Sequence, residues 1–231
     1  MAPRTAAHSM SPTWHACLKW WSGARRRGLR AAYITLQTWR RTAIFSDPTN
    51  FTANWAGPNV CAYNGVYCAP HPADGAVLVV VGLDLNHADI AGFLPANLPA
   101  GLPDLALLHL NSNRFCGVLP GTFLHLRLLH ELDISNNRFV GAFPAVVLAL
   151  PSLKYLDLRF NDFEGPIPPA LFDRPLDAIF LNSNRLTRIS SNTLRACVRG
   201  GRRRPRRGNR RARAPPGEAR GGQGGDAREA R

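Results

Sequence analysis

The fold is decided by residues 132–144, which read LDISNNRFVGAFP. Segments of the same pattern begin at residues 83, 108 and 156, and a shorter one begins at residue 179. Successive starts are therefore 25, 24, 24 and 23 residues apart. Self-similarity at such a period indicates stacked repeats, each of them one supersecondary unit.

Each repeat begins as a short strand, because the alternation Leu-x-Leu places apolar side chains on one face and the intervening residues on the other. An Asn follows five residues after the first Leu, where its amide can bond backbone groups that the turning chain leaves unpaired. A Phe two residues later adds a second apolar column, and Gly-x-[Leu/Ile/Phe]-Pro supplies a turn. The pattern predicts an α/β leucine-rich-repeat solenoid with a curved parallel sheet and about five repeats. The expected ladder of structural asparagines is Asn113, Asn137, Asn161 and Asn184.

The basic charge of the chain lies at its two ends. The 231 residues carry 29 Lys and Arg against 15 Asp and Glu, a formal net charge of +14. Residues 1–44 hold eight basic side chains and no acid, residues 198–231 hold twelve Arg and three acids, and residues 45–197 have a net charge of −3. The Arg-rich run at 202–213 lacks interleaved aromatic residues that would stack on bases, so nucleic-acid binding is not favoured. No run of 18 apolar residues is found, and no membrane span is expected.

An N-terminal cap is expected before the repeats. Residues 31–45 have the spacing of an amphipathic helix, which ends before Pro48. Cys61 and Cys68 enclose a short loop with a turn-forming Asn-Gly pair, so a disulfide between them is favoured over two free thiols. Asn50 begins the N-glycosylation sequon Asn-Phe-Thr. The expected organisation is disordered basic residues at 1–30, a cap at 31–76, repeats at 77–190 and a disordered Arg/Gly-rich tail at 191–231.

Some phrases of the sequence are more specific than a generic repeat. The cap, with Trp39, Trp55 and the Cys61 and Cys68 pair, is similar to the plant-type leucine-rich-repeat N-terminal domain. Over about residues 34–186 the chain resembles the leucine-rich repeat extensin family. The phrases that carry this resemblance include DLNHADIAG at 84–92, NSNRFCG at 111–117 and LDAIFLN at 176–182.

The resemblance implies an extracellular protein of the plant cell wall. It further implies three kinds of partner: small basic cysteine-rich peptides of the rapid alkalinization factor type, cell-wall components and a second copy of the chain. The family also has a secretion signal and a Ser-Pro-rich extensin region, neither of which this sequence shows, and the repeat pattern breaks after Leu186. A truncated member of the family is therefore expected.

The residues beside the inward leucines should line the concave face of the solenoid. An acidic face with aromatic anchors suits a basic peptide, although Asp at such positions is also common on a merely solvated surface. The expected peptide-binding residues are Asp84, His109, Glu131, Asp133, Tyr155, Asp157, Arg159 and Phe180.

Other functional classes have less support in the sequence. No nucleophile-elbow, P-loop or kinase motif is present, so we expect no enzyme, no catalytic residues, no cofactor and no metal site. The alternatives are a leucine-rich-repeat inhibitor of a pathogen's wall-degrading enzyme and an Arg-rich nucleic-acid-binding protein.

Overall fold

Helix α2 (Arg27–Thr42) opens the part of the chain that the computed structural model describes, residues 27–187. The helix buries Leu36 and Trp39 completely, as its apolar spacing predicts. It begins at Arg27, four residues before the expected start of the cap. The rest of the expected disordered ends, including the Arg-rich run at 202–213, lies outside the described residues.

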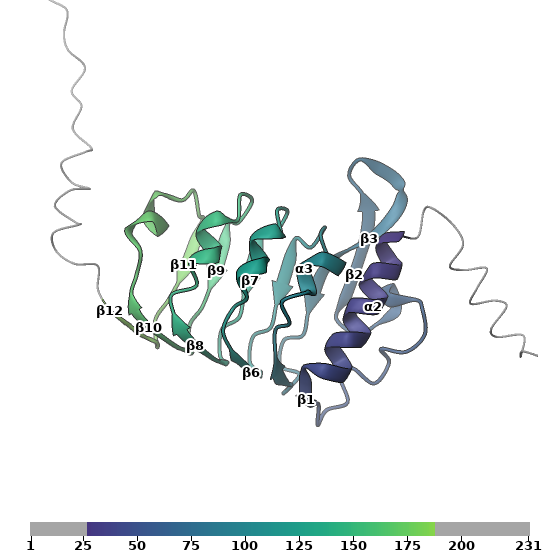
Figure 1. Cartoon of the computed structure of the whole chain (residues 1–231), viewed down its shortest axis with the longest axis horizontal. Coiled ribbons are helices and arrows are strands. Elements are labelled where there is room, and N and C mark those ends of the chain that lie inside the picture. Colours follow the sequence, from purple (N-terminus) through teal and green to yellow (C-terminus); the bar gives the residue numbers. More distant parts are fainter. Residues whose placement is uncertain (1–26, 188–231) are drawn as a thin grey trace, which may run out of the picture.

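One six-stranded sheet runs along the solenoid and carries the Leu-x-Leu segments (Figure 1). Its order is β11-β9-β7-β5-β3-β2, and all neighbours are parallel except the antiparallel pair β2 and β3. This is the predicted curved parallel sheet, extended at one end by a hairpin from the cap. The strands are β2 (Val66–His71), β3 (Asp74–Asp84), β5 (Leu107–His109), β7 (Glu131–Asp133), β9 (Tyr155–Asp157) and β11 (Ala178–Phe180).

A second six-stranded sheet lies along the other edge of the repeats, and the sequence analysis missed it. Its order is β1-β4-β6-β8-β10-β12, with β1 antiparallel to β4 and the others parallel. The sequence pattern indicated a turn because four of the six strands contain or end at a Gly, and Gly117, Gly141 and Gly165 have φ of +81°, +92° and +75°. The strands are β1 (Ile44–Ser46), β4 (Ala91–Phe93), β6 (Arg114–Gly117), β8 (Arg138–Ala142), β10 (Asp162–Pro166) and β12 (Arg185–Thr187).

Short helices connect the two sheets on the side of the repeats seen in Figure 1. Pro120, Pro144 and Pro168 each precede one of them, where their fixed φ suits a helix start. The helices of the repeats are α3 (Leu98–Gly101), η3 (Gly121–His125), η4 (Ala145–Ala149) and η5 (Pro169–Asp173), the last three being 3₁₀ helices.

The core is a set of apolar columns between the two sheets. The leucines of the concave strands, such as Leu108, Leu132 and Leu156, are fully buried. The rings of Phe139 and Phe163 stack with centroids 6.3 Å apart and an interplanar angle of 2°. Each such buried side chain stabilises the fold by about 1.5–3 kcal/mol. The apolar residues that recur in the repeat pattern are therefore the residues that form the core.

The expected asparagine ladder connects each repeat to the one before it. In Asn161, Oδ1 accepts a hydrogen bond from Phe139 N at 2.9 Å, and Nδ2 donates to Ile134 O at 2.9 Å. Asn113, Asn137 and Asn184 make the equivalent bonds in their own repeats. The ladder therefore pairs backbone groups that would otherwise be buried without a partner.

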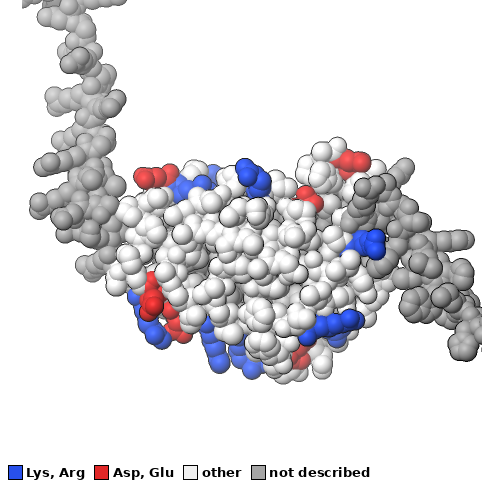
Figure 2. All heavy atoms as spheres, in the orientation of Figure 1, with Lys and Arg blue, Asp and Glu red and all other residues white. Residues whose placement is uncertain are grey.

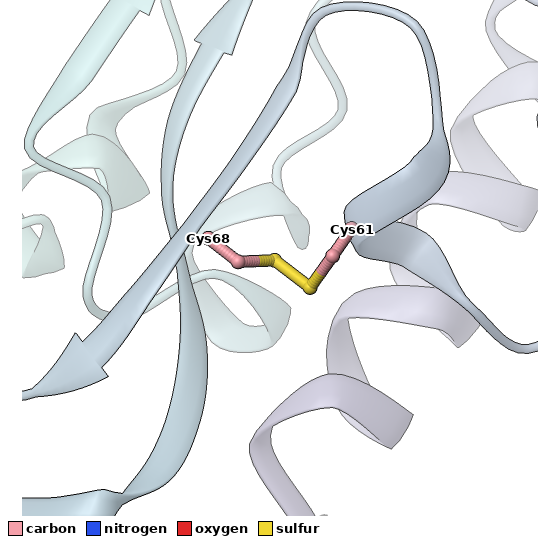
Figure 3. The surroundings of a disulfide bond; sticks show 2 residues. All are labelled: Cys61 and Cys68. Carbon is pink, nitrogen blue, oxygen red and sulfur yellow. A yellow bond between two sulfur atoms is a disulfide. The ribbon is translucent and has the colours of Figure 1, made fainter.

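The cap closes the N-terminal end of the solenoid through a polar and aromatic network. Gln37 Nε2 donates to Trp55 O at 2.9 Å and to Tyr63 Oη at 3.0 Å, while Trp55 Nε1 donates to Asn64 O at 2.9 Å. Figure 3 shows the predicted disulfide, which joins the 3₁₀ helix η2 (Val60–Ala62) to β2 with the Cα atoms 5.6 Å apart. The fully buried Trp55 therefore lies under a cross-linked loop.

Candidate functional site

The register of the concave sheet aligns seven of the eight expected site residues in two columns, and Arg159 follows the end of β9 outside both. Glu131 and Tyr155 are direct partners between β7 and β9. In the neighbouring column, the pairings run Asp84 to His109, His109 to Asp133, Asp133 to Asp157 and Asp157 to Phe180. The sheet thus brings the expected peptide-binding residues onto one surface, as their spacing in the sequence requires.

The middle of this surface is acidic. Asp133 is half-buried, and its Oδ1 accepts hydrogen bonds from Ser135 N at 2.9 Å and Ser135 Oγ at 2.6 Å. Asp84 is held in a similar way, with Oδ1 accepting from Asn86 N at 3.1 Å. These bonds fix the orientation of both carboxylates, whose charges still face the concave side.

His109 adds an imidazole beside the carboxylates. Its Nε2 lies 3.0 Å from Glu131 Oε2, and the side chain of Glu131 is about half exposed. The imidazole is flanked in the sheet by Asp84 and Asp133. His109 therefore places an imidazole within hydrogen-bonding distance of the Glu131 carboxylate.

The expectation that Asp157 presents an exposed carboxylate on the concave face is wrong. The residue is completely buried, and its carboxylate is held by the guanidinium of Arg159, with Nη2 2.6 Å from Oδ2 and Nε 3.0 Å from Oδ1. Arg159 in turn lies 4.6 Å from the centroid of the Phe180 ring. The ion pair is neutral, so the acidic part of the surface consists of Asp84, Glu131 and Asp133.

Aromatic side chains border the acidic residues at both ends. At the C-terminal end, the rings of Tyr155 and Phe180 are 5.7 Å apart. Burial raises the pKa of the Tyr155 phenol above its usual range, and the charges of Asp157 and Asp133 act in the same direction. The neutral phenol therefore persists through physiological pH as an apolar ring with a hydrogen-bonding end.

Tyr67 borders the acidic residues at the N-terminal end, and the sequence analysis missed it. The residue pairs with Gly82 across β2 and β3, and a Cβ on Gly82 would lie 3.3 Å from the Cβ of Tyr67. Gly82 lies in the same column as Glu131. Tyr67 is 56% exposed, and its pairing with Gly82 therefore extends the concave face beyond β3. The signal available in the sequence was the small Gly in a column of larger residues.

The other faces have different chemistry. Figure 2 shows that the face bearing the short helices carries few charged side chains, which gather along its upper and lower margins. On the second sheet, the partly exposed Cys116 is a free thiol. Asn50, the expected glycosylation site, is exposed in the turn after β1.

Two classes of feature are absent from residues 27–187. None of their helices is long and apolar enough to cross a membrane. They contain no group of three or more His, Cys, Asp or Glu side chains arranged to hold a metal ion.

Comparison with known proteins agrees with the repeat pattern. The family model for Leucine rich repeat matches residues 83–163. Leucine-rich repeat extensin-like protein 2 of Arabidopsis thaliana is 72% identical over 157 residues, which are 68% of this chain and 20% of that protein. The described domain belongs to the leucine-rich repeat extensin-like family. The chain spans about a fifth of the length of that relative.

Solved leucine-rich-repeat ectodomains share the fold of this extensin-like domain. The ectodomain of the Arabidopsis receptor kinase HAESA, in complex with an IDA peptide hormone ligand, superposes with a TM-score of 0.59 at 29% identity and covers 69% of this chain and 26% of its own. The PEPR1–AtPEP1 crystal structure gives a TM-score of 0.60 at 25% identity, covering 68% of this chain and 22% of its own.

Proposed function

We propose that this domain is an extracellular, non-enzymatic interaction module that binds small basic peptides on its concave face. The observation that carries the proposal is the run of three carboxylates, Asp84, Glu131 and Asp133, between Tyr67 at one end and Tyr155 at the other. Charged groups on one strip steer an oppositely charged partner, and aromatic rings at its ends anchor it.

The comparisons support the same class of function. The HAESA ectodomain, which shares the fold at 29% identity, has been crystallised with a peptide hormone. The relatives are named for extensins, which supports a role in organising the plant cell wall. From the family resemblance we further propose a peptide partner of the rapid alkalinization factor type, cell-wall components as other partners, and a homodimer.

The proposal is tested by measuring the affinity of a folded, disulfide-bonded rapid alkalinization factor peptide for the purified domain. The double variant Glu131→Gln, Asp133→Asn removes two charges and keeps the shape of both side chains. We expect its Kd to rise more than tenfold at low salt, with a shallower dependence on salt concentration. Asp157 is left intact, because removing it would leave Arg159 without its buried counter-ion.

Glu164→Gln is the matched control. Glu164 is exposed on β10 of the second sheet, so it has the same charge on a different face. Its substitution should leave the Kd unchanged. An unchanged Kd for the double variant, or an equal loss in the control, would contradict binding at the concave face.

A further inference from the structure

A polar hollow with a volume of about 210 Å³ lies at the edge of the second sheet, between α2, β1 and the turn that follows β1. It is separate from the concave sheet, because β1 is the terminal strand of the second sheet. The hollow is several times the volume of one water molecule, which is about 30 Å³. Its lining consists of Arg40, Ile44, Phe45, Ser46, Asp47, Asn50, Thr52 and Ala53.

The turn that forms one wall of the hollow is rigid. Asp47 accepts hydrogen bonds from Phe51 N and Thr52 N, both at 2.8 Å, and from Thr52 Oγ1 at 2.7 Å. Partial burial alone would raise the pKa of Asp47, but these hydrogen bonds outweigh it and lower the pKa below its usual range. The carboxylate is therefore used to shape the turn and is not a free ligand for a molecule in the hollow.

Asn50 stands at the rim of the hollow in a constrained conformation. Its φ is +55°, a left-handed conformation that Asn tolerates better than most residues. Its side chain is exposed and makes no hydrogen bond to any part of the chain that the structure describes. The amide nitrogen of the sequon is therefore free while the turn around it is fixed.

The lining of the hollow also includes an aromatic residue and a cationic donor. Phe45 is 65% exposed, and its ring lies 5.7 Å from that of Phe93. Arg40 uses Nη1 to donate to Trp55 O at 3.0 Å, which leaves other guanidinium N–H groups for hydroxyl or carbonyl oxygens. An exposed aromatic face beside such donors suits a pyranose, which has apolar C–H groups on its ring face and hydroxyl groups at its rim.

We propose that Asn50 carries an N-linked glycan whose first sugar, N-acetylglucosamine, lies in this hollow against the Phe45 ring. The geometry favours the sugar as the occupant, because Asn50, to which it would be attached, is one of the lining residues. The covalent attachment also gives the sugar a high effective concentration in the hollow. This inference rests on the proposed extracellular location, since the modification is made along the secretory route.

The modification is a glycosyl transfer from a polyprenyl-diphosphate-linked oligosaccharide. Asn50 Nδ2 forms a bond to C1 of the first sugar, and the bond between C1 and the diphosphate oxygen breaks. The diphosphate leaves with the electron pair of that bond, and Nδ2 gives up one proton to a base of the transferase. No oxidant or reductant is needed.

The position of Asn50 has two consequences. The first sugar would cover part of the exposed surface of Phe45, so the glycan would stabilise the cap as well as increase solubility. Because β1 and the concave sheet lie at different edges of the repeats, the glycan would leave the proposed peptide-binding surface open (Figure 1).

The test compares three glycoforms of the full chain, produced in a secretory host that makes high-mannose glycans and directed by a supplied signal sequence. The first keeps its glycan, the second is trimmed by an endoglycosidase to one N-acetylglucosamine, and the third is stripped by an amidase that converts Asn50 to Asp. We expect mass spectrometry to find the glycan on Asn50. We also expect equal Tm values for the first two forms and a Tm lower by about 2–4 °C for the third, a shift typical of one lost contact in a domain of this size.

Two variants separate a seated sugar from a merely attached one. In Phe45→Ser, the Tm difference between the one-sugar and stripped forms should vanish. In Phe172→Ser, which removes a comparably exposed ring from η5, that difference should remain. Each comparison contains the same Asn-to-Asp change, so the charge created by the amidase cancels.

An unmodified Asn50, equal Tm values for the one-sugar and stripped forms, or a difference that survives Phe45→Ser would each overturn the proposal. The supplied signal sequence keeps these outcomes independent of whether the native chain is secreted. That part of the proposed function is tested separately, by locating the native protein in plant tissue.

Discussion

Replacing Asn161 by Ala should destabilise the solenoid far more than its single amide suggests. The side chain is buried, its Oδ1 accepts from Phe139 N, and its Nδ2 donates to Ile134 O at 2.9 Å and Leu158 O at 3.2 Å. The variant would leave the Phe139 N–H unpaired in the core, while Ile134 O would keep only its bond from Asn137 Nδ2 at 3.1 Å. It would break the ladder between the third and fourth repeats.

The magnitude follows from the cost of unpaired buried groups. An unpaired buried N–H costs about 1–3 kcal/mol, so we expect a decrease of about 2 kcal/mol in the free energy of unfolding. With a urea m-value of about 2 kcal/mol/M, the unfolding midpoint should fall by about 1 M. Urea titration followed by circular dichroism measures this shift.

The control for this prediction is Asn182→Ala. Asn182 is exposed, and its amide reaches only Ser183 Oγ at 3.4 Å. Its removal should shift the midpoint by less than about 0.25 M, which corresponds to about 0.5 kcal/mol. If Asn161→Ala and Asn182→Ala behaved alike, the ladder would not stabilise the solenoid and the reasoning from paired backbone groups would be refuted.

Two further predictions concern the cap. Replacing both Cys61 and Cys68 by Ser should lower the free energy of unfolding by about 2–3 kcal/mol, because the disulfide restricts a short loop of the unfolded chain; a variant as stable as the oxidised wild type in urea titration would contradict this. The Asp47→Asn variant should be about 1 kcal/mol less stable than the wild type at pH 7, since an amide oxygen accepts fewer hydrogen bonds than a carboxylate. Because the folded pKa of Asp47 is lowered, the carboxylate contributes its stability above the unfolded value of about 3.9 and loses it as the pH falls through the folded value. Wild type and variant should therefore converge below about pH 4, and a constant gap from pH 7 to pH 3 would show that the ionised form of Asp47 is not the source.

The features that follow a strict period could be predicted from the sequence. The spacing of Leu132 and Asn137 within a repeat sets both the inward face of the strand and the ladder, and both occur as expected. The Cys61 and Cys68 pair was also predictable, because a short loop with a turn brings the two Cα atoms close. These residues could be predicted because they either lie close together in the sequence or recur at the same position of every repeat.

The features that depend on side chains from neighbouring repeats could not be predicted. Asp157 is equivalent in sequence to Asp133, yet it is buried because Arg159 and Phe180 cover it, and neither residue type occurs at the corresponding positions one repeat earlier. The second sheet was missed because strands of only three to five residues, four of which contain a Gly, lack the alternation that marks a strand. Tyr67 was missed because its place on the concave face depends on the antiparallel pairing of β2 with β3.

Site-specific photo-crosslinking tests the central claim, that a basic peptide binds the concave face, most directly. A photoreactive phenylalanine analogue replaces Tyr155 on the concave sheet in one protein and Phe172, an exposed aromatic residue on η5, in another. We predict that a rapid alkalinization factor peptide becomes linked to the first protein, in competition with unlabelled peptide, and not to the second. Crosslinking at position 172 with none at position 155 would contradict the account.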